Sequence, residues 1–161
     1  MKDFENNFSP NWKQIESIQI DGDLKSDYLL KEGDILIVRS NGSRNLVGRC
    51  IYIDETHAST SFSGFTIRLR LNSNIILPKL LCYYLRTDFV RSKMFDGSKG
   101  SNIKSINQDI LANIPVTIPE QTAQITVMQK IQKFEQQIEA AQKILDSAFA
   151  RKQAILDKYL Q

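Results

Sequence analysis

The stretch TIPEQTAQITVMQKIQKFEQQIEAAQKILDSAFARKQAILDKYLQ, residues 117–161, decides the architecture of this chain. It contains a set of positions whose spacings alternate strictly between four and three: Val127, Ile131, Phe134, Ile138, Ala141, Leu145, Ala148, Lys152, Ile155 and Tyr159. This alternation is the heptad pattern of a helix whose narrow apolar seam packs against another helix. Neither Pro nor Gly follows Pro119, so the pattern predicts one unbroken helix.

The length of this helix predicts a helical partner. About 40 residues at about 1.5 Å per residue give a rod of about 60 Å, which is too long for a domain of this size to wrap. The chain holds no second segment of matching length that could fill the seam. The alternative is a C-terminal helix that folds back on its own domain, for which apolar flanks wider than a two-position seam are expected.

Length and composition fit one globular domain with an appendage. The 161 residues suffice for a buried core, and a hydrophobic content of 42% with 24% charged residues is ordinary for a soluble protein. We expect neither a membrane span nor a secretory signal, because the chain lacks an apolar run of about 18 residues and its first ten residues lack an apolar core. Cys50 and Cys82 lack a CxxC spacing. We therefore expect reduced packing cysteines, no metal, no cofactor and a cytoplasmic location.

Charge is distributed unevenly along the chain. The formal net charge is −4 over residues 1–38, +7 over residues 39–104 and zero over residues 105–161. A basic middle third between segments that are not basic is typical of a face that meets a polyanion. The alternative is a solvated surface that is basic without a partner.

Three segments ahead of the long helix predict strands. Residues 35–38 form a β-branched run after a turn at Gly33, and residues 46–53 follow a polar cluster that contains Asn-Gly, so 35–53 is a hairpin or a pair of neighbouring strands. Residues 65–71 alternate apolar and polar side chains. The alternation places on the core side Phe65, Ile67, Leu69 and Leu71, and on the outer side Thr66, Arg68 and Arg70.

The remaining segments predict helices joined by loops. Pro78 suits the first turn of a helix over residues 78–95, which is followed by a basic Gly/Ser-rich loop over residues 97–104. Residues 107–111 predict a helical turn and residues 113–116 an extended segment. Thr117 and Glu120 have capping-box spacing, which predicts that the long helix begins there. The fold class is therefore α+β, with a mixed α/β domain over residues 1–116 and the helix over residues 117–161.

Enzymatic motifs are absent from the sequence. It has no phosphate-binding glycine loop, no HExxH, no GxSxG and no dinucleotide fingerprint. The sole histidine, His57, lies in a polar loop, where a surface histidine is the simpler interpretation than a general base. Asp21, Asp23 and Asp27 do not complete a cation-binding loop. A binding module is the better class.

Three blocks in order resemble the DNA specificity subunits of type I restriction-modification systems. Residues 30–43 with 47–49 resemble the core of a target recognition domain, as do residues 100–107. Residues 114–121, which read Ile-Pro-Val-Thr-Ile-Pro-Glu-Gln and open the heptad helix, are the most specific block. Together the blocks extend the resemblance over about residues 28–161. The segment before Tyr28 departs from the family, because it is shorter than the usual first portion and lacks its opening motif.

The resemblance implies a non-catalytic subunit that reads DNA. A full family member carries two recognition domains and two long helices that pair as an antiparallel coiled coil, and this helix pair holds the methyltransferase subunits. This chain resembles one half of such a member, so the resemblance implies a homodimer that reads a bipartite site in double-stranded DNA. It also implies methyltransferase partners and, in the complete system, a restriction subunit. The alternative is a truncated fragment that docks through its helix on other subunits without reading DNA.

Basic and amide side chains of the middle third are the candidate DNA contacts, because Lys and Arg bind phosphates and Asn and Arg pair with base edges. The candidates are Arg39, Asn41, Ser43, Arg44, Arg49, Arg68, Arg70, Lys99, Ser101, Asn102 and Lys104. The alternative for Arg68 and Arg70 is that they only solvate an exposed sheet face.

Overall fold

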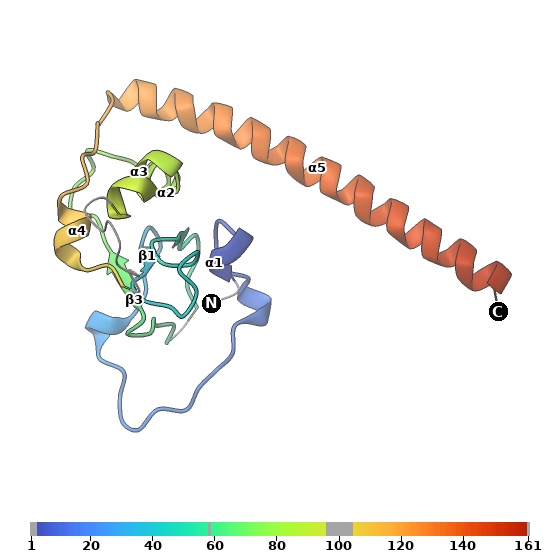
Figure 1. Cartoon of the computed structure of the whole chain (residues 1–161), viewed down its shortest axis with the longest axis horizontal. Helices are drawn as coiled ribbons and strands as arrows, with labels where there is room; N and C mark the ends of the chain where they lie inside the picture. Colours follow the sequence, from blue (N-terminus) through green and yellow to red (C-terminus); the bar gives the residue numbers. More distant parts are fainter. Residues whose placement is uncertain (1–2, 58, 96–104, 161) are drawn as a thin grey trace. The chain divides into compact units, whose positions relative to one another are not determined.

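The computed structural model describes residues 3–57, 59–95 and 105–160 and divides the chain into two compact units. Unit 1 spans Met1–Ile118 and unit 2 spans Pro119–Gln161. Unit 1 holds a small antiparallel sheet with short helices, and unit 2 is a long helix, so the predicted α+β class is confirmed (Figure 1). The division into a recognition domain over residues 1–116 and a separate helix over residues 117–161 stays a prediction.

The sheet has three strands in the order β2-β1-β3, with β1 over Ile35–Val38, β2 over Cys50–Tyr52 and β3 over Thr66–Leu69. Both partners pair with β1 in antiparallel fashion, and Ile37 lies opposite Cys50 on one side and Ile67 on the other. The predicted pairing of the first two strands is therefore confirmed. A turn with positive φ at Gly33 precedes β1, as the sequence predicts.

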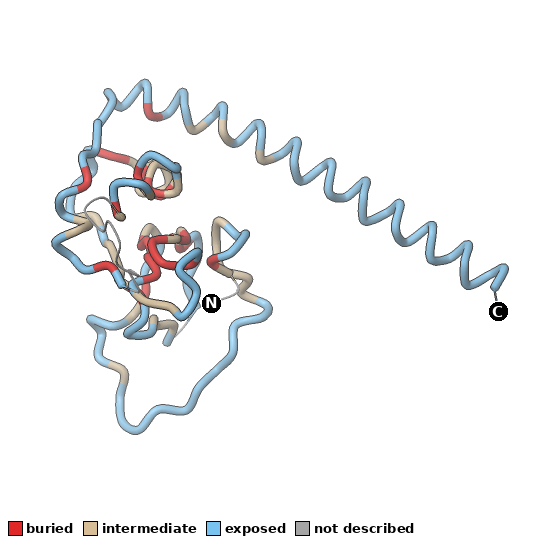
Figure 2. The backbone as a smooth tube through the Cα atoms, in the orientation of Figure 1, coloured by how far each residue is buried: buried red, intermediate tan, exposed pale blue. Residues whose placement is uncertain are grey.

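Strand β1 is buried on both faces, because an apolar cluster covers each side of the sheet. Ile35 and Ile37 belong to the first cluster, which includes side chains of α2 (Pro78–Leu85) and α3 (Asp88–Phe95). Leu36 and Val38 belong to the second cluster, which includes Phe4 of α1 (Asp3–Asn6). Figure 2 shows this burial as red tube in β1 and neighbouring segments. The alternation of side chains along the strand thus supplies both clusters.

The second and third strands differ from the sequence prediction. Residues 46–48 form turns and Arg49 lies outside the strand, because Gly48 adopts a positive φ of 77° and its N–H donates to Val38 O at 2.9 Å. The prediction is also wrong about which side chains point to the core at the start of β3. Phe65 is 62% exposed and Thr66 is 8% exposed. The Thr66 N–H and hydroxyl both donate to Ser63 O, which turns Thr66 inward at the start of the strand.

The single helix predicted over residues 78–95 is two helices. Helix α2 ends at Leu85 and α3 begins at Asp88. Arg86 Nη1 donates to Asn7 O at 2.8 Å and to Cys50 O at 2.6 Å, and the Thr87 hydroxyl accepts from Val90 N at 3.4 Å. These bonds anchor the break between the helices, because Thr87 takes the place of an N-cap for α3. The packing of α2 against β2 and of α3 against α2 completes the first cluster.

The two cysteines lie in the first cluster, where β2 meets α2. Cys50 and Cys82 are both free and 0% exposed, and their Sγ atoms lie 3.9 Å apart. The buried thiol of Cys82 has a raised pKa because of its hydrogen bond with Cys50 and its burial. They are therefore packing residues, as the sequence predicts.

Short helical turns and the long helix complete the chain. Unit 1 also contains the 3-10 turns η1 (Trp12–Gln14) and η2 (Ser26–Tyr28) and the helix α4 (Gln108–Ala112). The Asn107 side chain caps α4 by accepting from Ile110 N at 2.9 Å, which confirms the predicted helical turn. Helix α5 runs over Gln121–Leu160 without a break, so Pro119 and Glu120 precede the first turn and the predicted capping box is wrong.

Two polar pairs of helix α5 lie away from the heptad seam. Lys143 Nζ lies 2.7 Å from Glu139 Oε1, and Gln153 Nε2 donates to Asp157 Oδ1 at 2.9 Å. These side chains occupy the b and f positions of the heptad, on the side opposite the seam. No helix in residues 3–57, 59–95 or 105–160 has a stretch long and apolar enough to span a membrane.

Candidate nucleic-acid interface

The connection between β1 and β2, residues 39–49, is a compact loop held by its own hydrogen bonds. Asn41 Oδ1 accepts from Ser43 N at 2.8 Å, and Leu46 N donates to Ser43 O at 3.1 Å. Leu46 and Val47 are buried beneath the loop, whereas Arg39, Ser43 and Arg44 are exposed. Buried apolar residues thus fix the loop while its polar side chains remain at the surface.

The basic segment 97–104, with the candidates Lys99, Ser101, Asn102 and Lys104, lies outside the described residues. Its two flanks are described, and both contact the connection 39–49. On one flank the Phe95 ring lies 5.7 Å from the Arg44 guanidinium. On the other flank Ile106 N donates to Arg39 O at 2.8 Å, and Ser105 pairs with Ser40 in an isolated β-bridge. The fold therefore brings the residues that border this segment to the connection 39–49, which holds the candidates between Arg39 and Arg49.

Gly48 is the residue that permits this approach. A Cβ on Gly48 would lie 2.8 Å from Met94 Sδ, and the φ of +77° disfavours any L side chain. The end of α3 therefore packs directly against the backbone of the connection. The sequence shows a glycine here, but only the packing explains it.

Arg39 and Arg44 are candidate cations whose guanidinium groups are accessible. Both are exposed, and neither guanidinium forms a hydrogen bond or ion pair within the described part of the chain. The contact of Arg44 with Phe95 is to a ring face, which leaves the N–H groups of the guanidinium available. Phosphate oxygens are acceptors that suit such donors.

Arg68 and Arg70 hold the structure of unit 1 together. Arg68 Nη1 donates to Asp27 O at 2.5 Å and to Leu29 O at 3.3 Å. Arg70 donates to Leu29 O at 3.0 Å and forms an ion pair with Asp34 at 2.6 Å. The hydrogen bonds that Arg70 donates to the Asp34 carboxylate raise the pKa of Arg70. Both side chains therefore attach η2 and the segment after it to the sheet. Their role as DNA contacts stays a prediction.

Arg49 and Arg91 converge on one carbonyl. Arg49 Nε donates to Asn45 O at 3.0 Å, and Arg91 Nη2 donates to the same oxygen at 3.3 Å. Burial and the charge of Arg49 lower the pKa of Arg91, and its buried Nη1 has no partner among the described residues. Arg49 Nη1 also donates to Glu5 O. Arg91 was not among the candidates from sequence, because only the fold places the polar side of α3 beside the connection.

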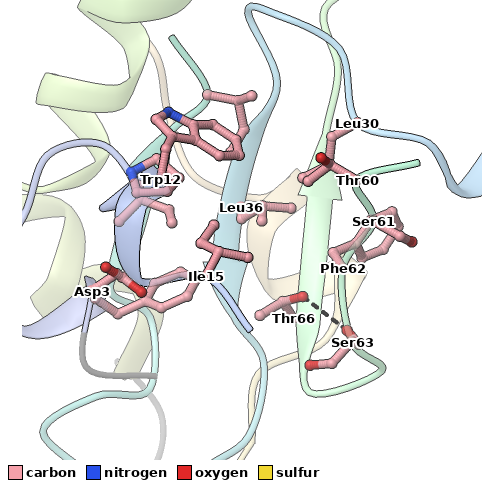
Figure 3. Close-up of a pocket in the computed structure, with 14 residues that line it drawn as sticks. Asp3, Trp12, Ile15, Leu30, Leu36, Thr60, Ser61, Phe62, Ser63 and Thr66 are labelled. Carbon is pink, nitrogen blue, oxygen red and sulfur yellow. Dashed lines mark hydrogen bonds between the residues drawn. The ribbon is translucent and has the colours of Figure 1, made fainter. Parts of the chain in front are cut away.

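A pocket of about 200 Å³ opens on the side of the sheet that carries the second apolar cluster (Figure 3). Trp12, Ile15, Leu36 and Phe62 are among its lining residues. Asp3 is the one carboxylate of the lining, and its Oδ1 already accepts from Asn11 N at 3.1 Å. The pocket therefore presents an apolar surface, and the polar chemistry of unit 1 lies instead at the connection 39–49.

Metal-binding geometry is absent from the part of the chain that the structure describes. Residues 3–57, 59–95 and 105–160 contain no group of three or more His, Cys, Asp or Glu side chains able to hold a metal ion. His57 lies 3.5 Å from Glu55, with both side chains 60% exposed, at the surface as the sequence predicts.

The heptad seam of α5 lies open along most of its length. Phe134, Ile138 and Leu145 are 65%, 69% and 52% exposed. The other apolar seam residues are Val127, Ile131, Ala141, Ala148, Ile155 and Tyr159, all exposed except the half-buried Ile131. A further apolar residue, Ile144, is 69% exposed beside the seam. Large apolar side chains in such a row indicate a surface that a partner covers.

Comparisons with known proteins agree with these features. Residues 4–148 match the family model described as the type I restriction modification DNA specificity domain. Over 146 residues, 89% of its length, the chain is 27% identical to the type I restriction enzyme StySPI specificity subunit of Salmonella potsdam. The chain spans 31% of the length of that relative. No solved structure matches.

Proposed function

This chain belongs to the family of type I restriction-modification DNA specificity domains, and on that premise we propose that it recognises double-stranded DNA through one face of unit 1. The face consists of the connection 39–49 and the segment 97–104, whose flanking residues Phe95 and Ser105 lie against that connection. The contacts of Phe95, Ser105 and Ile106 with the connection 39–49 are the observation that carries the proposal.

Each part of this face has a separate role. The exposed guanidinium groups of Arg39 and Arg44 bind phosphates, which gives affinity without sequence selectivity. Asn41 uses its side-chain oxygen to hold Ser43 N, so its amide N–H groups remain to donate to acceptors on a base edge. Lys99, Ser101, Asn102 and Lys104 add donors from the second segment. Arg91 joins Arg49 behind the connection and strengthens the positive potential there.

The complete reader is a homodimer. Its α5 helices pair through their seams, so that two copies of unit 1 read the two halves of a bipartite site. The helix pair also binds methyltransferase subunits and, in the complete system, a restriction subunit. The dimer supplies recognition and no catalysis, and it works in the cytoplasm.

A second candidate function is docking without DNA recognition. Arg49, Arg68, Arg70 and Arg86 donate to backbone carbonyls or carboxylates of the chain itself, which removes much of the basic third from the available surface. In that case the chain would bind intact restriction-modification subunits through α5 alone.

Duplex binding with and without the methyltransferase subunit separates the two candidates. Fluorescence anisotropy on the full chain with labelled random duplexes, at several salt concentrations, measures binding by the chain alone. The methyltransferase subunit is then added, and bound sequences are recovered and read. We expect salt-dependent binding by the chain and enrichment of a split sequence in the complex. Association with the methyltransferase without any gain in duplex binding would overturn the reading function in favour of docking.

A further inference from the structure

The seam of α5 contains features that a generic coiled coil does not need. Ala141 and Ala148 are small, whereas Phe134 is large, and Lys152 places an ammonium group among apolar positions. Beside Ala148 and Lys152 the surface of α5 has a groove, which Ile144, Ile155 and Leu156 also line. These irregularities restrict how two copies can align, because large residues must meet small ones and a buried charge needs a suitable neighbour.

We propose that two copies pair antiparallel with their twofold axis beside residue 143, a register that rests on the proposed homodimer. In this register, seam residues equally far before and after 143 face each other. The resulting pairs across the seam are Leu145 with Ala141, Ile138 with Ala148, Ile131 with Ile155, Phe134 with Lys152, and Val127 with Tyr159. Each alanine therefore meets a larger aliphatic residue, and the groove beside Ala148 receives Ile138 and Phe134 of the second copy.

Lys152 finds both an apolar and a charged neighbour in this register. Its ammonium group lies over the ring of the second copy's Phe134, which is a favourable cation–π arrangement. Glu135 of the second copy comes directly after Phe134, at an e position beside the seam. The Lys152 side chain can therefore extend toward the Glu135 carboxylate at the edge of the seam. The register thus accounts for the charged residue in the heptad pattern.

The flanks of the seam support the same register. In an antiparallel pair, e positions face e positions and g positions face g positions. Ile144 then meets Ile144 of the second copy at the axis, and Met128 meets Leu156. The register also brings Lys130 near Lys158 at the ends of the pair, where solvent screens the repulsion.

Other alignments fit the seam less well. A parallel pair in register would place Lys152 against Lys152, Phe134 against Phe134 and each alanine against itself, which combines repulsion, crowding and gaps. The e and g positions of a parallel pair would make acceptable contacts. The contacts between seam residues are what disfavour that pair. Moving the antiparallel axis one heptad step toward the N-terminus places Lys152 opposite Val127 and Lys130 near Arg151. That alignment removes the partner of the ammonium group and adds a like-charge contact.

Paired cysteines in the full chain test the register. Ile138 and Ala148 face each other only in this alignment, whereas within one helix they are about 15 Å apart at about 1.5 Å per residue, too far for a disulfide. The variant I138C/A148C is oxidised mildly and examined by non-reducing electrophoresis, beside the single variants I138C and A148C. The natural chain is the control, because Cys50 and Cys82 are 0% exposed. Sedimentation of each reduced variant shows whether it is dimeric.

We expect a disulfide-linked dimer from the double variant and none from either single variant. Cross-linking of the single variants would show a parallel pair, and a dimer in which no variant cross-links would show a different antiparallel register. Either outcome overturns the register while the homodimer stands. A monomeric natural chain at micromolar concentration would instead overturn the homodimer itself, and the register with it.

Discussion

Arg70 forms a two-pronged ion pair with Asp34, whose residue surface is 1% exposed: Nε lies 2.6 Å from Oδ1, and Nη2 lies 2.7 Å from Oδ2. Asp34 Oδ2 also accepts from Lys31 N at 2.8 Å, within the turn that precedes β1. The pair therefore joins the end of β3 to the start of the central strand. Both residues come from polar positions beside apolar runs, where sequence alone suggests a solvated surface.

Replacing Arg70 with alanine should destabilise unit 1, because it leaves the buried carboxylate of Asp34 without its cation. We expect a loss of about 2 kcal/mol in the free energy of unfolding, which is less than for a fully buried pair because the Arg70 side chain is 31% exposed. Urea denaturation of the full chain measures the loss. R68A is the matched control, since Arg68 donates only to carbonyls and should cost about 1 kcal/mol. Equal losses in the two variants would contradict the special role of the Asp34 pair.

Charge reversal at Arg39 or Arg44 should weaken duplex binding. If Arg39 and Arg44 bind phosphates as proposed, each of R39E and R44E removes one such contact and adds repulsion, so the slope of log affinity against log salt should become shallower by about 1. Anisotropy at several salt concentrations measures the slope. K13E is the control, since Lys13 is an exposed cation of η1 outside the proposed face. An unchanged slope for R39E and R44E would remove these arginines from the DNA face. Charge reversal at Lys104 extends the same test to the second segment.

Substituting Gly48 with alanine should destabilise unit 1. The added Cβ would meet Met94 Sδ at 2.8 Å, and the backbone holds a positive φ. We expect a cost of about 1–3 kcal/mol in the free energy of unfolding. G42A is the matched control, because a Cβ at Gly42 meets nothing within 4 Å and its φ lies outside the left-handed region. Thermal or urea unfolding compares them, and similar stability of G48A and G42A would argue against the tight contact with α3.

An aspartate at Ile138 should break the proposed homodimer. The carboxylate would enter the seam once from each copy, and we expect the dimer dissociation constant to rise by about 100-fold or more. Sedimentation equilibrium measures the constant. Q136D is the control, since Gln136 lies at an f position on the outer side of the helix. If Q136D weakened the dimer as much as I138D, the partner surface would not be the heptad seam.

The thiols of Cys50 and Cys82 should resist modification in the folded chain. Both residues are 0% exposed, and their burial between β2 and α2 excludes reagent and solvent alike. We expect negligible reaction with Ellman's reagent in native buffer and two equivalents after unfolding in guanidinium. Rapid reaction of either thiol in native buffer would show that the contact between β2 and α2 opens readily.

Periodicity made several elements predictable. The run 35–38, the return strand and the alternation after residue 65 gave the sheet, because strand period and burial depend on local residue order. Predictions from local residue order failed where tertiary contacts override local preferences. Thr66 turns inward through its bonds to Ser63, residues 46–49 follow the positive φ of Gly48, and α2 separates from α3 at Arg86, whose guanidinium binds distant carbonyls.

The candidate site was predictable only in part. The excess of basic residues over 39–104 and the Asn-Gly connection are visible in sequence, since composition and turn chemistry are local. Which arginines remain available is not local. Arg70 is bound to Asp34, Arg49 and Arg91 share the carbonyl of Asn45, and Arg39 and Arg44 stay exposed, because pairing depends on which segments the fold brings together.

The sequence by itself determined the long helix, its seam and the α+β class, because a heptad repeat and alternating strands are properties of residue order. It also determined membership of the family through three blocks in order. Only the tertiary structure decided that the flanks of residues 97–104 meet the connection 39–49, and that Arg68 and Arg70 secure the fold from within. Contacts between residues far apart in the chain depend on the packing of both apolar clusters, and no local pattern encodes them.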